Sequence, residues 1–250
     1  MYIAYSSMKY VNEAIFSAAS LKKHHPKLKI MLITDLIDKV KRIKHPFDIL
    51  ERIDPKEVAI RCKIKFMYPK SPFDRTIFID TDTYVSLPID DMFAVLDKFD
   101  IAVAHDFARK RTVNHHKKDV KIPGGYGFSK LKEYAEIPYA FPEFNTGIIA
   151  YKKSDQVKGF FEAWVKTYKQ FKSHTPYDQP SFRVALWNSN LRIHTLPLEY
   201  NCRAKATRQK NITYRERGIF TKDHLQPRIY HFHGIPSMNQ EQIEKAAQII

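Results

Sequence analysis

The segment from Arg75 to Val85 reads RTIFIDTDTYV and decides the fold. Its first half is an apolar and β-branched run of strand length, and two carboxylates, Asp80 and Asp82, follow it on either side of Thr81. Like charges this close repel each other unless a cation, a shared proton or water lies between them. A chain with this aspartate content contains about one Asp-x-Asp triplet by chance. The informative feature is therefore its position directly after a strand pattern.

The segments on both sides of this triplet alternate between strand and helix patterns. Short apolar runs typical of buried strands cover residues 2–6, 29–35, 47–53 and 100–106. Helices are expected over residues 11–21, 56–68 and 90–96. This alternation predicts a mostly parallel sheet with helices on both faces, and such sheets bind ligands at the carboxyl ends of their strands. Asp80 and Asp82 are expected at that edge.

The second half of the chain has a less regular pattern. FNTGIIAYKKS (residues 144–154) predicts a strand entered through a glycine-bearing turn, and residues 155–171 predict an amphipathic helix. Short strands are expected at RIHTLP (192–197) and RIYHFHG (228–234), and a closing helix at residues 238–250. With neither repeats nor Gly/Ser linkers in the sequence, we expect one α/β domain over residues 1–250.

Composition and charge narrow the class of protein. A net charge of +15 and a pI near 9.6 predict that the protein binds a polyanion. The candidates are nucleotide phosphates, nucleic acid, and an anionic glycan or membrane surface. The charge concentrates in residues 108–121 and 203–217, which also fit plain solubilising loops. Cys62 and Cys202 form no disulfide framework, and no run of 18 apolar residues occurs, so a soluble, cytoplasmic protein without a transmembrane segment is expected.

Three chemistries fit the aspartate pair. Asp80 and Asp82 can hold a divalent cation whose shell a diphosphate completes, and that cation would neutralise charge on a departing nucleoside diphosphate. The pair also resembles the nucleophile motif of haloacid-dehalogenase-type phosphatases, with Asp80 as nucleophile and Asp82 as acid/base, but the sequence lacks the Gly-Asp dipeptide of that class. A non-enzymatic nucleic-acid-binding module would explain the charge and leave the triplet unexplained. An N-cap or a solvated turn is the simplest alternative.

Six segments in order resemble a known family: residues 2–35, FIDTDTYV, FNTGIIAYKKS, DQPSF, LPLEYN and IYHFHG. Together they look like the glycosyltransferases with a GT-A fold, in the family-8-like group that includes glycogenin and the bacterial lipooligosaccharide galactosyltransferases. The resemblance covers residues 1–234. It implies a Rossmann-like, mixed, mostly parallel sheet flanked by helices, with a nucleotide-binding half (1–105) and an acceptor and metal half (106–250). It also implies a nucleoside-diphosphate sugar donor, such as a UDP-sugar, and Mn²⁺ or Mg²⁺.

The resemblance assigns a metal site. Asp80 and Asp82 match the metal-binding Asp-x-Asp, with Asp80 also near the donor, and His231 matches the third ligand. An imidazole beside two carboxylates favours Mn²⁺ over Mg²⁺. His233 lies two residues on, on the same side of a strand, and is the alternative ligand.

The resemblance also assigns donor-binding and catalytic residues. Tyr5 and Ser6 match positions that hold the nucleoside, and Lys63, or alternatively Arg61, matches a cation at the donor's sugar and phosphates. The remaining matches lie around the reacting sugar and the diphosphate: Asn145, Thr146 and Gly147 at the donor sugar, Asp178 and Gln179 beside the reacting carbon, and Gly234 at the diphosphate.

These matches imply a reaction and leave its acceptor open. Ser237 stands where the family carries a diphosphate-binding lysine, so residues 203–217 are expected to meet that charge. The expected reaction retains the anomeric configuration, with the leaving diphosphate oxygen as base and Gln179 or Asp178 stabilising the cationic sugar. A glycan or lipid-linked sugar, or a hydroxylated base in DNA, would accept the sugar.

Overall fold

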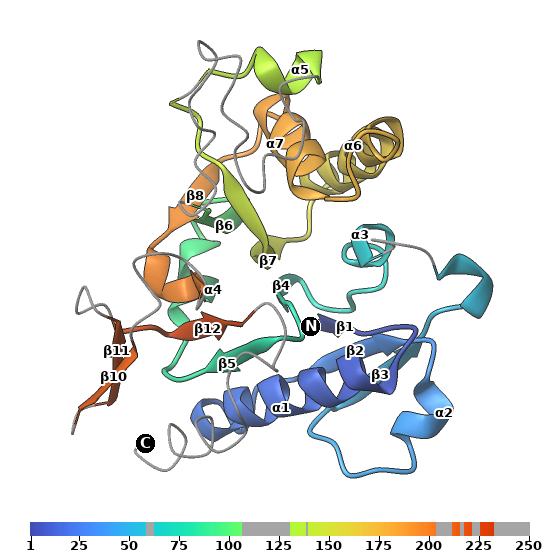
Figure 1. Ribbon diagram of the computed structural model, residues 1–250, viewed down its shortest axis with the longest axis vertical. Coiled ribbons are helices and arrows are strands. Elements are labelled where there is room, and N and C mark those ends of the chain that lie inside the picture. Colours follow the sequence, from blue (N-terminus) through green and yellow to red (C-terminus); the bar gives the residue numbers. More distant parts are fainter. Residues whose placement is uncertain are drawn as a thin grey trace, which may run out of the picture.

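The structure is a computed structural model and describes residues 1–58, 63–106, 131–138, 140–203, 212–215, 218–221 and 226–232 (Figure 1). Its strands are β1 (Tyr2–Ile3), β2 (Met31–Thr34), β3 (Ile49–Arg52), β4 (Arg75–Ile79), β5 (Thr83–Val85), β6 (Ile101–His105), β7 (Phe144–Lys152), β8 (Ile193–Leu196), β9 (Cys202–Arg203), β10 (Ile212–Arg215), β11 (Gly218–Thr221) and β12 (Ile229–His231). Its helices are α1 (Met8–His24), α2 (Ile37–Val40), α3 (Lys63–Phe66), α4 (Asp91–Val95), α5 (Lys132–Ala135), α6 (Asp155–Phe171) and α7 (Gln179–Trp187), with 3₁₀ turns η1 (Pro55–Glu57) and η3 (Leu198–Asn201).

Two sheets meet edge to edge through Met1. One has the order β1-β2-β3 and the other the order β4-β7-β6-β8. The backbone nitrogen of Met1 donates to the carbonyl oxygen of Ile77 at 2.8 Å, and the N–H of Ile79 donates to the carbonyl of Met1 at 3.1 Å. This is a parallel pairing, so the strands form one continuous surface.

Strand direction defines the two edges of this surface. β1, β2 and β3 pair in parallel, and so do β6 and β8, whereas β7 runs antiparallel to both β4 and β6. The carboxyl ends of β1, β4 and β6 therefore lie at one edge, together with the start of β7. We call this the carboxyl edge, and the opposite one the amino edge.

The core has two layers because successive side chains of a strand face opposite sides of the sheet. Phe78 and Val103 pack in one cluster with Trp164 of α6 and Phe182 of α7. Ile77, Ile79, Ala102 and Ala104 pack in the other with α1 and α4. Figure 1 shows α1 on one side of the strands and α6 and α7 on the other.

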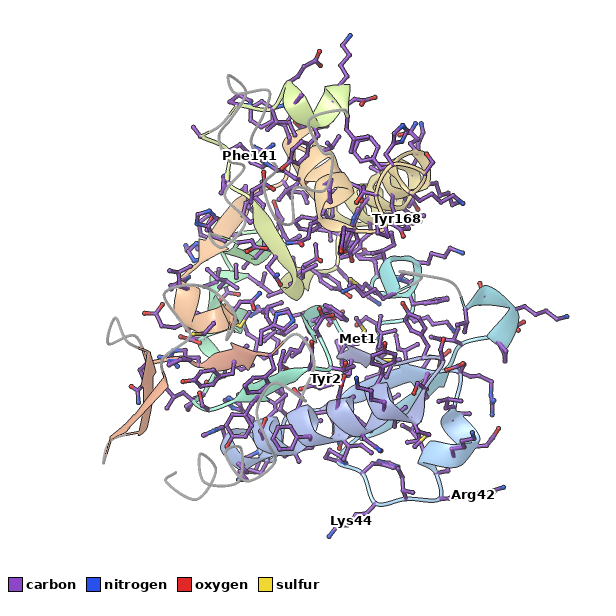
Figure 2. The ribbon with its side chains drawn as sticks, viewed as in Figure 1. Met1, Tyr2, Arg42, Lys44, Phe141 and Tyr168 are labelled. Atoms are coloured by element: carbon purple, nitrogen blue, oxygen red, sulfur yellow. The ribbon has the colours of Figure 1, made fainter. Side chains whose placement is uncertain are left out.

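The first two residues of the chain show how neighbouring side chains enter different layers of the core. In Figure 2, Met1 and Tyr2 lie inside the molecule, and they belong to different core clusters. Arg42 and Lys44, in the segment after α2, are exposed at the periphery.

Local sequence explains the two longest helices. Ser7 caps α1 by accepting from the N–H of Lys9, and Ser154 caps α6 by accepting from the N–H of Val157. The apolar residues of α6 recur at helical spacing and are buried: Val157, Phe160, Phe161, Trp164, Tyr168 and Phe171.

Three predictions of local structure are wrong. Residues 203–217, expected to be a basic loop, include β10, which pairs antiparallel with β11. The helix expected over residues 56–68 is interrupted, because η1 ends at Glu57 and the backbone of the next residue, Val58, is extended (φ −69°, ψ 113°). Asn145 and Gly147 lie inside β7 and not in a turn before it, and the register between β6 and β7 shifts there in a bulge. Among the described helices, none has the length and apolar character needed to cross a bilayer.

Candidate active site and metal centre

The Asp-x-Asp triplet forms the link between β4 and β5 at the carboxyl edge. The backbone N–H of Asp80 donates to the carbonyl of Gly147 in β7 at 2.7 Å. The N–H of Phe232 donates to the carbonyl of Asp82 at 2.9 Å, and Thr83 donates from its hydroxyl to the carbonyl of Asp80. Main-chain bonds therefore tie both aspartates to their neighbours.

β12 brings His231 to this link. The strand pairs antiparallel with β5, with His231 opposite Thr83. Its Nε2 lies 3.2 Å from Oδ1 of Asp82 and 3.9 Å from Oδ2 of Asp80. The imidazole is only 3% exposed, whereas the two carboxylates are partly open to solvent. The three predicted metal ligands are thus brought together, although His231 is 149 positions from Asp82.

These three side chains fit a divalent cation. One atom from each lies within 4.8 Å of the others, a spacing that an ion between them can bridge. Two hard carboxylate oxygens and one imidazole nitrogen form a donor set suited to first-row ions such as Mn²⁺. The site also lies in the sheet position that fits a phosphate-bearing ligand.

Lys63 of α3 connects the triplet to a second acidic residue. Its Nζ lies 2.9 Å from Oδ1 of Asp80 and 3.6 Å from Oδ2 of Asp178, and its side chain is 9% exposed. The ammonium also lies 5.2 Å from the centre of the Phe78 ring. Lys63 is therefore held beside the two aspartates, where it counters their mutual repulsion.

The bulged start of β7 packs against the histidine. A Cβ added at Gly147 would lie 2.5 Å from Cε1 of His231, so a side chain has no room there. Thr146 donates from its hydroxyl to Oδ1 of Asp178 at 3.2 Å. Asn145 accepts at its Oδ1 from the N–H of Gly147 and from Nδ2 of Asn201. The predicted sugar-contacting residues thus lie directly beside the metal-ligand cluster.

Asp178 and Gln179 lie at the start of α7, with Asp178 at its N-cap position. The backbone carbonyl of Asp178 accepts from the indole nitrogen of Trp164 at 3.2 Å. Nε2 of Gln179 donates to Oδ2 of Asp106 at 2.9 Å and to the carbonyl of Phe144 at 2.8 Å. Both amide hydrogens are therefore used, and the orientation of the amide group is fixed.

The predicted nucleoside positions occupy the turn after β1. Ser6 has a positive φ of 70°, uncommon for a non-glycine residue and costly by about 1 kcal/mol or more. Its N–H donates to both carboxylate oxygens of Asp35, at 3.0 and 3.2 Å. Tyr5 is half-buried against the core. The strained turn faces the carboxyl edge because β1 and β4 run in parallel.

A polar stripe on α1 was not predicted. Glu13 is 5% exposed and accepts from the hydroxyl of Thr81, between the two aspartates, at 3.2 Å. Ser17 bonds Thr83 at 2.6 Å, and Ser20 accepts from the N–H of Val85. The signal in the sequence is the spacing of Glu13, Ser17 and Ser20, which places them on one helix face.

Asp35, Asp106 and Asn201 also reach the site or its supports without having been predicted. Asp35 and Asp106 each follow an apolar strand, as Asp80 does, so the same rule would have found them. Burial raises the pKa of the neighbouring Cys202 thiol to about 12, which fits an ordinary buried thiol. Several predicted residues and segments lie outside the described residues: Arg61, Cys62, His233, Gly234, Ser237, residues 108–121, the greater part of 203–217, and the helix at 238–250.

The sheet order, the acidic link and the histidine define a sugar-nucleotide-binding α/β domain of the GT-A type. A family model described as nucleotide-diphospho-sugar transferase matches residues 75–238. The chain therefore belongs to the nucleotide-diphospho-sugar transferase family, and the GT-A fold predicted from the sequence is confirmed. No curated protein matches the sequence.

Solved structures share this fold at low sequence identity. A galactosyltransferase LgtC in complex with donor and acceptor sugar analogs is 14% identical, with a TM-score of 0.59 over 100% of this chain and 94% of that one. Mouse xyloside xylosyltransferase 1 is 14% identical, with a TM-score of 0.56 over 96% and 97%. The bifunctional glycosyltransferase WbbM is 15% identical, with a TM-score of 0.58 over 92% of this chain and 45% of that one.

Proposed function

We propose that this protein is a metal-dependent glycosyltransferase that moves a sugar from a nucleoside diphosphate, most simply UDP, to a hydroxyl acceptor. The observation that carries the proposal is the cluster of Asp80, Asp82 and His231 at the carboxyl edge, in a chain of the nucleotide-diphospho-sugar transferase family. That family assignment removes the support for a phosphatase with Asp80 as nucleophile and for a non-enzymatic nucleic-acid module.

The chain's own residues supply binding and orientation. Asp80, Asp82 and His231 would hold Mn²⁺ or Mg²⁺, which neutralises negative charge on a leaving diphosphate. Lys63 is held against Asp80 and Asp178, and it would add a positive charge beside the same diphosphate. The turn at Tyr5 and Ser6 would receive the nucleoside, since it lies at the same edge. We propose that residues 1–105 bind the nucleotide. Residues 106–250 would form the acceptor-binding site and provide the third metal ligand, His231.

Retention of configuration is the stereochemical outcome that we propose. Gln179 has both amide hydrogens engaged by Asp106 and Phe144, so its carbonyl oxygen is the end suited to face positive charge on the sugar. Asp178 directly precedes Gln179 in the sequence, and it accepts a hydrogen bond from the hydroxyl of Thr146. Thr146 in turn follows Asn145 at the start of β7. A leaving diphosphate oxygen would then take the acceptor proton on the near face of the sugar.

A saccharide hydroxyl is the acceptor class favoured by the relatives of similar fold, one of which is named for acting on xylosides. A hydroxylated base in DNA is the second candidate, and the net charge of +15 is the observation that favours it. The test is a donor screen with Mn²⁺, in which hydrolysis of UDP-hexoses and UDP-pentoses is measured with oligosaccharide, with plain duplex DNA and with DNA carrying a hydroxymethylated base.

The proposed function predicts metal-dependent release of UDP and transfer of label to one of these acceptors. If label enters only hydroxymethylated DNA, replacing Arg203, Lys205, Arg208 and Lys210 by Ser should flatten the dependence of log affinity on log salt by about 0.9 per lost phosphate contact. If label enters only the saccharide, the DNA candidate is wrong. If no nucleotide sugar is hydrolysed or transferred with any divalent ion, the proposed function is wrong.

A further inference from the structure

A chain of hydrogen bonds joins His231 to the start of β7 through Asn201. Nδ1 of His231 lies 2.9 Å from Oδ1 of Asn201. Nδ2 of Asn201 donates to Oδ1 of Asn145 at 2.8 Å, and the backbone N–H of Gly147 donates to that same oxygen at 2.9 Å. All three side chains are buried, with exposed fractions of 3% for His231, 3% for Asn201 and 5% for Asn145.

The backbone N–H of Gly147, at one end of this series of hydrogen bonds, fixes the donor and acceptor of every bond in the series. The backbone N–H of Gly147 can only donate, so the atom of Asn145 that faces it is the carbonyl oxygen. Asn201 must then present its NH₂ group to that oxygen, which turns its own carbonyl oxygen toward His231. A carbonyl oxygen can only accept, so Nδ1 of His231 carries a proton.

The proton on Nδ1 determines the state of the other ring nitrogen of His231, Nε2. In a neutral imidazole with a proton on Nδ1, the lone pair is on Nε2. Nε2 faces a carboxylate oxygen of Asp82 at 3.2 Å, so a cation held between these two atoms would accept that lone pair and remove their repulsion. The ring also has little freedom to turn, because Gly147 packs against its Cε1 edge. The ligand atom is thus selected by a hydrogen bond on the far side of the ring.

We propose that Asn201 is a positioning residue that presents Nε2 of His231 to the metal and, through its NH₂ group, fixes the amide of Asn145. With Oδ1 of Asn145 already accepting two bonds, Nδ2 of Asn145 is the group that it offers to a substrate oxygen. Asn201 therefore couples the metal site to the sugar site. The inference rests on the proposed function for the identity of both sites.

Two substitutions separate the two bonds of Asn201. Asn201→Asp keeps an oxygen that accepts from Nδ1 of His231 and loses the donor to Asn145. Asn201→Leu has nearly the same size and loses both bonds. Asn190→Leu, at an exposed asparagine between α7 and β8, is the matched control. Folding of each variant is checked by circular dichroism, and Asn201→Ala replaces the leucine variant if that one does not fold.

Metal affinity is measured without donor or acceptor, by the loss of the free Mn²⁺ signal in electron paramagnetic resonance. Asn201→Leu should weaken Mn²⁺ binding about 10–100-fold, the usual effect of removing the partner of a metal-bound histidine. Asn201→Asp should stay well under about tenfold, and yet its kcat/KM for the nucleotide sugar should fall, because the amide of Asn145 is released.

A spectroscopic readout tests the ring proton itself. In the Co²⁺-substituted protein, the ring N–H of a bound histidine gives a strongly shifted exchangeable proton resonance. We expect this resonance in the wild type, in Asn201→Asp and in Asn190→Leu, and its loss to solvent exchange in Asn201→Leu.

Different outcomes would overturn the positioning role of Asn201, the metal site and the proposed function. Unchanged Mn²⁺ affinity and a persistent N–H resonance in Asn201→Leu would show that Asn201 does not position the ring. Equal losses of Mn²⁺ affinity in Asn201→Asp and Asn201→Leu would show that the accepting oxygen is not what matters. A wild type that binds no Mn²⁺ would overturn the metal site, whereas one that binds Mn²⁺ and transfers no sugar would overturn the proposed function alone.

Discussion

Strand β6 has an aspartate at each end, and the two ends show how the edges of the sheet differ. At the amino edge, Asp100 accepts from the backbone N–H of Arg192 at 2.9 Å and from its guanidinium at 3.0 Å, and Nζ of Lys152 lies 3.2 Å away. At the carboxyl edge, Asp106 accepts from the side-chain amide of Gln179 at 2.9 Å.

The two edges use charge in different ways. Hydrogen bonds from the side chain and backbone of Arg192 and from Lys152, followed by the charge of Arg192, hold the pKa of Asp100 down to about 2 despite its burial, so this carboxylate stabilises the fold. At the carboxyl edge, Asp80 and Asp82 converge on one another around His231. Converging like charges are unfavourable for folding, and their value lies in the cation that they can bind. The edge that stabilises the chain is therefore distinct from the edge that we propose binds ligand.

The largest expected effect on activity comes from removing a candidate metal ligand at the carboxyl edge. Asp82→Ala removes one of the three candidate metal ligands, so Mn²⁺-dependent activity should fall by about 10²–10³-fold, the scale of losing one preorganised electrostatic contact. The Mn²⁺-plus-UDP increase in melting temperature should disappear as well, because a ligand that no longer binds no longer stabilises the folded state. A full thermal shift in Asp82→Ala would exclude this residue from the metal site.

The next effect compares Gly147, in the candidate site, with Gly159, outside it. Gly147→Ala places a Cβ 2.5 Å from His231, so the ring must move and Mn²⁺ affinity should fall by about tenfold or more. Gly159→Ala in α6, where a Cβ meets nothing within 4 Å, should leave metal binding unchanged and stabilise the helix by up to about 1 kcal/mol. Isothermal titration and thermal unfolding measure both. Equal Mn²⁺ affinities in the two variants would contradict the packing argument.

A smaller effect sharpens the role of Asp106. Asp106→Ala leaves Gln179 with only the carbonyl of Phe144 as acceptor among the bonds described, so its amide should turn more freely and kcat should fall about tenfold. Asp106→Asn keeps an accepting oxygen and should lose less. The Mn²⁺ affinity of both should match the wild type, and a loss of metal binding in Asp106→Ala would place this residue in the metal site instead.

The smallest effect on activity belongs to the amino edge. The pKa of Asp100 is below its unfolded value, so its stabilisation is complete above about pH 4 and is lost as the pH falls toward 2. Asp100→Asn should lower the free energy of unfolding at pH 7 by about 2 kcal/mol and leave activity unchanged. Urea unfolding between pH 7 and pH 2 measures this, and the variant and wild type should converge in acid. A constant difference over the whole range would show that charge is not the cause.

The sequence predicts β2, β4 and β6 well because each is a short apolar run that ends next to a polar residue. It does not predict β10, whose four residues ITYR carry no apolar run. It also predicts Asp80, Asp82 and His231, since their spacing resembles a known family. It does not predict Asn201, although the LPLEYN segment stands out, because its role depends on what two distant strands bring to it. It does not predict Glu13 for a related reason: the apolar residues alone carry the helix pattern of α1, and the role of a buried acid on that helix depends on its contact with Thr81.

The central claim is that the carboxyl edge binds a divalent cation between Asp80, Asp82 and His231. The most direct test is anomalous diffraction at the manganese edge from crystals grown with Mn²⁺ and UDP. We predict one strong peak within bonding distance of a carboxylate oxygen of Asp82 and of Nε2 of His231, and no such peak in crystals of His231→Ala. A manganese peak elsewhere in the wild type, with His231 still bonded directly to Asp82, would contradict it.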